Sequence, residues 1–233
     1  MNEQFEAIDV LKDGKSFVRL INSMGSDVDI VNGARVSFGK RKETMDKNDK
    51  VLIDYLVEHR HTSPLEHVSF TFHIKCPLFV TRQWHRHRTW SYNEISRRYT
   101  SINMEFYIPE KYRRQAKDNR QASIDDDSVI FQNGRDGKTV AEAIKNHTDS
   151  AYKFYEDLIE MGVAREQARM VLPQNMYTEM YASVDLHNLL HFIELRVHEG
   201  AQWEIQQYAK ALLDLVEPAV PEAIKAVRKY RNW

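Results

Sequence analysis

The spacing of apolar residues along this chain predicts a mixed α+β protein that contains more helix than strand. Apolar and β-branched residues alternate in two segments, which predicts strands at 68–76 and 176–184. Helical spacing of apolar residues predicts helices at 28–38, 47–61, 78–84, 139–160, 165–171, 186–198 and from 202 to the breaks at Pro218 and Pro221, after which we expect a last basic turn.

Capping and turn residues support several of these boundaries. Polar residues that can cap a helix start are Ser26, Ser63, Thr139 and Asp185. Pro64 follows one of them at the first helical position, where its missing N–H costs little. Asp13-Gly14 lies between the apolar segments 5–11 and 17–21, so we predict a hairpin of two short strands there.

The order of these elements predicts one domain over residues 1–233, without a linker or an internal repeat. Residues 111–137 are an exception to the packed pattern. They are polar, contain the acidic run Asp125–Asp127 and carry turn residues at Gly134 and Gly137. We expect this segment to be an exposed and mobile insertion.

Charge and cysteine content narrow the class of protein. The formal net charge is -1, so long-range attraction to nucleic acid or to an anionic membrane is not built into the chain. Cys76 is the only cysteine, which excludes an internal disulfide and fits a reducing compartment, the cytoplasm by default. The first residues do not read as a secretory signal, and we expect no membrane span.

A local anion site is predicted at residues 82–98, which hold five arginines and the single acid Glu94. Small hydrogen-bonding residues and two aromatic rings stand between the arginines, namely Ser91, Asn93, Ser96, Trp90 and Tyr92. Guanidinium groups for phosphate and flat rings for stacking suggest a nucleotide. A solvated basic face is the plain alternative. No glycine-rich phosphate loop occurs, so side chains must hold the phosphates.

A second group of polar residues lies on one face of the helix predicted at 186–198. His187, His191, Glu194 and His198 are spaced four, three and four apart, which permits a metal site. No second ligand-bearing helix is evident, and the neighbouring cation Arg196 disfavours a metal. We therefore expect no metal and favour a polar face packed on a ligand or on a partner subunit.

Two other classes of function stay open from the residues alone. A metal-dependent hydrolase could use His187, His191 and Glu194. A single-stranded nucleic-acid binder could use the arginines with Trp84, Trp90 and Tyr92, although the balanced charge speaks against it. Nothing marks a base for Cys76, so we expect a small core residue rather than a nucleophile.

The run RHRTWSYNEISRR at 86–98 resembles the signature RHRxxSxNxxSxR of flavin-dependent thymidylate synthases of the ThyX type. Further segments resemble that family in the same order, including HTSPLEHVSFTFHIKCPLFVTRQW, ARMVLPQNMYTEMYASV, FIELR and AQWEIQQYA. The resemblance covers nearly the whole chain and is weakest in the polar insertion after Tyr112.

The resemblance implies the helix-rich ThyX fold with a mixed arrangement of helices and antiparallel sheet, assembled as a homotetramer with shared active sites. The implied reaction is reductive methylation of dUMP to dTMP. In it, 5,10-methylenetetrahydrofolate donates the carbon, NADPH supplies hydride through FAD, and tetrahydrofolate is released. No enzyme cysteine attacks the pyrimidine in that family, which agrees with an inert Cys76.

Site residues follow from the resemblance by position. Implied FAD contacts are Ser63, Arg86, His87, Arg88, Glu94, Asp185, His187 and His191, with support from Glu66. Implied dUMP contacts are Gln83, Arg86, Glu94, Ile95, Ser96, Arg97, Arg98, Arg169 and Arg196. Arg196 is the implied catalytic residue, because its charge can stabilise the ionised pyrimidine. Family members typically have Asn where Asp185 stands, and an ionised Asp cannot donate to a flavin carbonyl.

Overall fold

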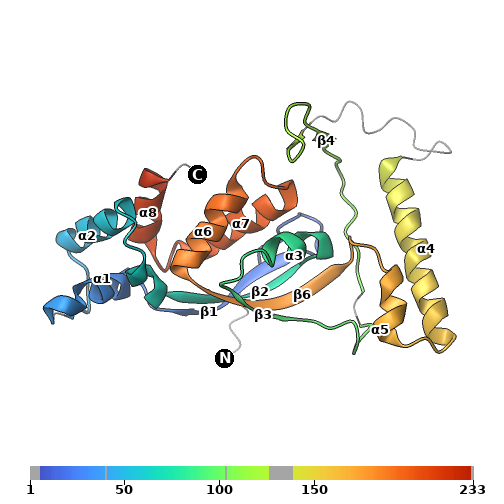
Figure 1. Ribbon diagram of the computed structural model, residues 1–233, viewed down its shortest axis with the longest axis horizontal. Coiled ribbons are helices and arrows are strands. Elements are labelled where there is room, and N and C mark those ends of the chain that lie inside the picture. Colours follow the sequence, from blue (N-terminus) through green and yellow to red (C-terminus); the bar gives the residue numbers. More distant parts are fainter. Residues whose placement is uncertain (1–5, 40, 103, 126–138, 232–233) are drawn as a thin grey trace.

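The computed structural model describes residues 6–39, 41–102, 104–125 and 139–231, and an antiparallel sheet forms its centre (Figure 1). The strand order is β1-β2-β6-β3. The strands are β1 (Phe17–Met24), β2 (Ser69–Pro77), β6 (Tyr177–Asp185) and β3 (Ser91–Glu94). The long central pair β2 and β6 runs in register from Ser69↔Asp185 to Pro77↔Tyr177.

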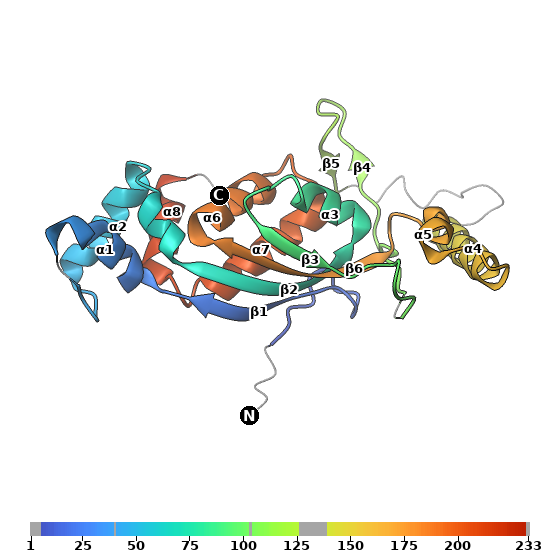
Figure 2. The same cartoon turned by 60° about the horizontal axis from the view of Figure 1, so that its bottom comes forward.

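One face of this sheet forms the main core. Phe70, Phe72 and Ile74 of β2 are buried, as the alternation of apolar residues predicts, and they pair with β6 residues whose side chains are also buried. Three helices cover this face (Figure 2). They are α3 (Leu78–Trp84), α6 (Leu186–Val197) and α7 (Trp203–Val216).

The two ends of the sheet carry separate groups of helices (Figure 1). At one end lie α1 (Asp27–Arg35), α2 (Lys47–Glu58) and α8 (Pro221–Tyr230). At the other end α4 (Val140–Glu160) and α5 (Arg165–Ala168) pack around a small second core with Tyr155 and Ala168 at its centre. Short 3-10 turns span Val36–Phe38, Ser63–His67 and Arg169–Val171.

Most predicted elements are confirmed. The strands at 68–76 and 176–184 and the helices at 28–38, 47–61, 78–84, 139–160, 165–171, 186–198 and 202–216 all occur, with ends shifted by a few residues. Thr139 accepts from the Glu142 N–H at 3.2 Å, which is the predicted cap of α4. None of the helices in the described part of the chain is long and apolar enough to cross a membrane.

Three predictions need correction, and one strand was not predicted. Among residues 6–11 only Ile8 pairs with Val18, so the predicted first strand of the hairpin is wrong there; Phe5 lies outside the described residues. Thr62 rather than Ser63 occupies the cap position, without a side-chain bond. The expected last basic turn is the ten-residue helix α8. Strand β3 was not predicted, because its four residues contain a single aromatic residue, Tyr92, and show no clear alternation.

The polar insertion is described only in part. Its first half forms a small ribbon of β4 (Arg114–Gln115) and β5 (Ser123–Ile124), which projects from the body (Figure 2). The expectation for 126–137 lies outside the described residues.

Candidate functional site

The guanidinium of Arg196 is held by groups that carry no charge. Arg196 lies in the last turn of α6, and its Nε donates to Nε2 of His87 at 3.0 Å. Its Nη2 donates to the main-chain carbonyl of Gln83 at 3.0 Å, and Nη1 lies 3.4 Å from the Gln83 Oε1. Hydrogen bonds therefore connect the end of α6 to the end of α3 and the turn after it, although 109 residues separate Arg196 from His87.

His87 acts as an acceptor because it is neutral. Its side chain is buried, at 8% exposure, beside the ring of Phe192. Burial, then the charges of Arg196 and His191, lowers the pKa of His87 to about 4. At neutral pH the ring thus presents the Nε2 lone pair to Arg196. Burial also lowers the pKa of Arg196, which nonetheless stays cationic.

A cavity of about 450 Å³ opens beside this cluster. Gln83, Arg196 and Gln202 form one side, and residues of the β4–β5 ribbon, among them Gln115 and Ser123, form the other. Among the described residues no carboxylate pairs with Arg196. A positive group without an acid partner at a cavity wall is suited to bind an electron-rich or ionising ligand.

A second cavity, of about 520 Å³, brings Arg86 and Glu94 together between α3 and β3. Glu94 accepts a hydrogen bond from Thr178 Oγ1 at 2.7 Å, which fixes its carboxylate at the rim. Arg82 and His85 line the same cavity; Arg82 belongs to the predicted anion site, but neither residue was among the implied FAD or dUMP contacts. The run RQWHRHR could have indicated them, since it places polar residues on both sides of the buried Trp84.

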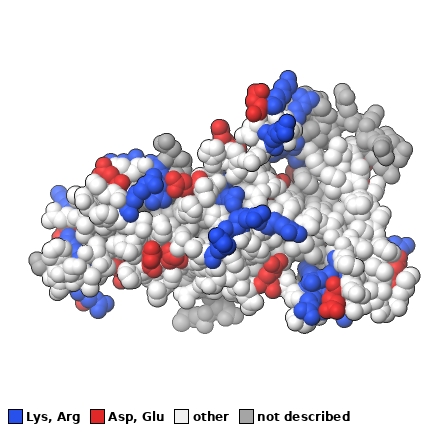
Figure 3. All heavy atoms as spheres, viewed as in Figure 1, with Lys and Arg blue, Asp and Glu red and all other residues white. Residues whose placement is uncertain are grey.

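A band of basic side chains crosses the molecular face over α3 (Figure 3). Arg82, Arg86 and Arg88 are exposed residues of this segment. Within the described part of the chain neither Arg86 nor Arg88 forms an ion pair. Two unpaired guanidinium groups fit an anionic ligand such as the phosphates of a nucleotide cofactor.

Arg98 and Arg169 form a separate basic pair. Arg98 Nη2 lies 3.3 Å from Glu166 Oε2, and Arg169 Nε donates to the Glu166 carbonyl oxygen at 3.3 Å. Ser96 Oγ accepts from the Arg98 N–H at 3.3 Å, so the hydroxyl lies beside the Arg98 main chain. Segments α5 and α6 lie in different parts of the molecule, and this pair is therefore apart from Arg196 (Figures 1 and 2).

Two neighbours in the arginine run serve the fold. Arg97 is buried, and its guanidinium donates to the carbonyls of Ile102 at 2.7 Å and Tyr177 at 3.4 Å. The Ile95 N–H donates to the Glu179 carbonyl at 2.9 Å and extends the pairing of β3 with β6. Both residues position the segment on either side of Ser96.

The prediction that Trp90 and Tyr92 offer free faces for stacking is wrong. Trp90 is 6% exposed and packs against Trp84 and Phe192. The Tyr92 ring stacks on Trp90, and its hydroxyl donates to the His87 carbonyl at 3.0 Å. These rings stabilise the turn that carries the arginines, which also removes the stacking platform of the nucleic-acid-binding alternative.

Helix α6 contacts the 3-10 turn at Ser63–His67, so Ser63 and His187 come from neighbouring elements. Nδ1 of His187 is buried and has no hydrogen-bond partner among the described residues. Asp185 instead caps α6, with its two oxygens accepting from the Asn188 N–H at 2.9 Å and the Asn188 amide at 2.6 Å. A buried orphan nitrogen is a position that a bound ligand can satisfy.

The metal alternative finds no support in the described residues. They contain no group of three His, Cys, Asp or Glu side chains arranged to hold a metal ion. Glu194 lies 3.2 Å from Arg231, and Nδ1 of His198 accepts from the Gly200 N–H at 3.0 Å. Cys76 is fully buried, and burial raises the pKa of its thiol, as a core residue requires.

Comparison with known proteins gives consistent matches. A family model described as thymidylate synthase complementing protein matches residues 19–222. The flavin-dependent thymidylate synthase of Thermus thermophilus is 50% identical over 220 residues, which cover 93% of this chain and 77% of the relative. That of Thermosipho africanus is 45% identical over 217 residues, covering 93% and 92%.

Solved structures resemble the fold as well. The UMP/dUMP methylase PolB from Streptomyces cacaoi, bound with 5-Br UMP, matches with a TM-score of 0.80 at 32% identity, covering 92% of this chain and 94% of that one. The same enzyme bound with 5-Br dUMP gives a TM-score of 0.76 at 31% identity, covering 92% and 95%.

Proposed function

The chain belongs to the family of flavin-dependent thymidylate synthases, and we propose that Arg196 and Gln83 hold the pyrimidine of dUMP in the cavity beside His87. The observation that carries this proposal is the environment of Arg196. Neutral acceptors fix its guanidinium, so its charge is available to the ligand. A preorganised cation at this point stabilises negative charge as the imide of the pyrimidine ionises, which activates the ring toward an electrophile.

The enzyme methylates dUMP to dTMP reductively, with 5,10-methylenetetrahydrofolate as carbon donor and NADPH as reductant. FAD, when bound, supplies the hydride transfer between these substrates. The protein contributes binding and orientation: Arg196 polarises the base, and neutral His87 keeps Arg196 in place. Cys76 takes no part, since its thiol is buried in the sheet.

The residues proposed to hold FAD are Ser63, Arg86, His87, Arg88, Glu94, Asp185, His187 and His191. Among the described residues Arg86 and Arg88 have no ion-pair partner, so their guanidinium groups suit its phosphates, and Nδ1 of His187 has no hydrogen-bond partner, which a cofactor can supply. Since the Asp185 carboxylate is occupied by Asn188, we assign its contact to the backbone at the start of α6.

The residues proposed to hold the rest of dUMP surround its phosphate. Ser96, Arg98 and Arg169 lie together and offer a hydroxyl with two cations. We assign Arg97 a contact through its main chain, because its guanidinium is engaged in the fold. The Ile95 N–H is bonded to the Glu179 carbonyl, so we assign its contact to its remaining groups. Arg86 and Glu94 lie between the two ligands at the rim of a shared cavity.

A homotetramer explains why the two halves of the dUMP site lie apart in one chain. In this arrangement the Ser96, Arg98 and Arg169 group of one subunit completes the Arg196 cavity of another, and folate enters at the same shared site. The exposed Tyr99, Ile102 and Met170 near the basic pair suit burial against such a subunit. We further propose one domain over 1–233 and a cytoplasmic location.

The decisive experiment combines spectroscopy with product analysis. The purified protein should bind FAD, show a flavin absorbance spectrum that bleaches with NADPH, and form dTMP from dUMP and 5,10-methylenetetrahydrofolate. Omission of NADPH or of the folate should each stop dTMP formation. A protein that does not bind FAD, or that forms no dTMP with all substrates present, would refute the proposed function.

A further inference from the structure

We propose that Gln202 and Glu204 are positioning residues of the dUMP site, which fix the amide of Gln83 and through it the guanidinium of Arg196. The inference rests on the function proposed above and extends it to two residues outside the predicted site. Gln202 precedes α7, and Glu204 lies in the first turn of that helix.

Hydrogen bonds connect these four side chains in one direction. Arg196 Nη1 donates to Gln83 Oε1, the Gln83 amide nitrogen donates to Gln202 Oε1, and the Gln202 amide nitrogen donates to Glu204 Oε2 at 2.9 Å. An ionised carboxylate only accepts, so Glu204 sets the orientation of every amide before it. A reversed Gln83 amide would aim its NH₂ group at the Arg196 guanidinium, where two donors repel.

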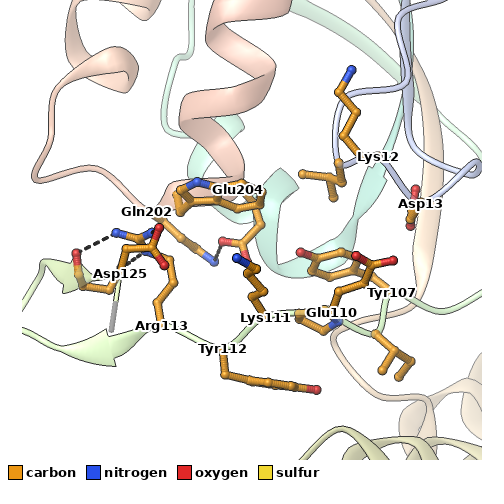
Figure 4. A pocket seen from close by; sticks show the side chains of 15 residues that line it. Lys12, Asp13, Tyr107, Glu110, Lys111, Tyr112, Arg113, Asp125, Gln202 and Glu204 are labelled. Atoms are coloured by element: carbon orange, nitrogen blue, oxygen red, sulfur yellow. Dashed lines mark hydrogen bonds and ion pairs between the residues drawn. The ribbon is translucent and has the colours of Figure 1, made fainter. Parts of the chain in front are cut away.

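The position of Gln202 explains how the two residues reach the site. It lies in the wall between the 450 Å³ cavity that contains Arg196 and a neighbouring cavity of about 470 Å³ lined by Glu204, Tyr107 and other residues. Figure 4 shows Gln202 and Glu204 joined by their hydrogen bond at the 470 Å³ cavity. Glu204 lies in the first turn of α7, where the helix dipole favours a negative charge.

Other glutamines at the start of α7 have different partners. Gln206 donates to the Ala201 carbonyl at 2.8 Å, and Gln207 donates to the Trp203 carbonyl at 3.3 Å. These bonds stabilise the helix and its entry. Gln202 alone of the three uses both ends of its amide on other side chains, which is the arrangement expected of a residue that orients the site.

The first test breaks the series of hydrogen bonds from Arg196 to Glu204 without reducing the side-chain volume at position 202. Gln202→Leu should raise the Kd of dUMP, measured by calorimetry, about tenfold and lower kcat for dTMP formation, because Gln83 is left without its acceptor. FAD content should stay at the wild-type level. Gln207→Leu is the matched control, and it should leave both the Kd and kcat close to the wild-type values.

The second test first breaks this series of hydrogen bonds with an added charge and then restores it with different groups. In Gln202→Glu the introduced carboxylate faces Glu204, so activity relative to wild type should be low at neutral pH and rise as the pH falls and the new group gains a proton. In the double variant Gln202→Glu with Glu204→Gln, the amide at 204 donates to the carboxylate at 202, which still accepts from Gln83. This variant should regain near-wild-type dUMP affinity without the added pH dependence.

These outcomes separate the inference from the proposed function. A Gln202→Leu variant that binds dUMP as tightly as wild type, or a double variant no better than Gln202→Glu, would overturn the positioning role. A wild-type protein that forms no dTMP would instead overturn the proposed function.

Discussion

The guanidinium groups of Arg196 and Arg98 lie in two different electrostatic environments. Arg196 is half-buried and fixed by three bonds to the neutral groups of His87 and Gln83. Arg98 has half of its side chain exposed and pairs with Glu166 across 3.3 Å. The first guanidinium is preorganised and keeps its charge for a ligand. The second is paired with an exposed acid that a phosphate can displace at little cost.

This difference indicates that the two arginines have different functions. A group that acts on the reacting ring benefits from a fixed position before the substrate arrives, because no reorganisation is then needed during the reaction. A group that captures a phosphate benefits from access and reach, and it gains its order from the charge-assisted bonds that the phosphate brings. The following predictions test this division, beginning with the largest expected effect.

Loss of the preorganised charge should affect turnover most. Arg196→Ala should lower kcat for dTMP formation roughly a hundredfold to a thousandfold, the range for removal of a group that stabilises developing charge. FAD should stay bound, as read from the absorbance spectrum of the purified variant. Arg228→Ala, which breaks only an exposed pair with Glu217, is the control and should keep full activity. Unchanged turnover in Arg196→Ala would contradict the assigned role.

Loss of the exposed charge should affect binding. Arg98→Ala should raise the Kd of dUMP roughly tenfold to a hundredfold, because one charge-assisted contact to phosphate is lost, with a smaller effect on kcat at saturating dUMP. Calorimetry with dUMP measures the first quantity and a dTMP assay the second.

Mixed assemblies of the same two variants test whether one site combines two chains. Co-expressed Arg196→Ala and Arg98→Ala subunits should form about a quarter of their sites with both residues intact, if one chain supplies each residue. Co-expressed Arg98→Ala and Arg169→Ala subunits should recover none, because both changes lie in the same group. If neither mixture recovers activity, Arg98 and Arg196 belong to the site of a single chain.

The smallest effect is expected from the acceptor of Arg196. The pKa of His87 is about 4 in the folded chain against an ordinary value of 6.5, so the unfolded chain binds more protons between these values. The free energy of unfolding should therefore fall as the pH drops from about 6.5 to about 4, by an amount on the order of 2 kcal/mol. His87→Gln keeps an acceptor without a titrating proton, and denaturant titrations should show a smaller loss over this window. An equal loss in both proteins would contradict a buried neutral His87.

The sequence alone determined most of the regular elements and the chemical character of the site. Alternation in 68–76 and 176–184 and helical spacing from 139 to 160 depend on local periodicity, and the structure confirms them. The motif at 86–98 indicated an anion site for a nucleotide, and the family to which it pointed is confirmed.

Only the tertiary structure decided how that motif is used. Its residues lie within 13 positions of one another, yet Arg86 and Arg88 face outward, Arg97 enters the core and Arg98 reaches Glu166. Strand β3 lies between these two pairs of arginines, and its pairing with β6 fixes the position of the segment from which Arg97 and Arg98 extend.

The sequence likewise did not indicate which residues orient the site. Gln83 meets Gln202 across 119 positions, and Arg196 meets His87 across 109. Local spacing shows which residues share a helix face, but it cannot show which distant face they meet. That choice is made by the packing of α3, α6 and α7 on one sheet, where burial of their apolar sides brings the polar ends together.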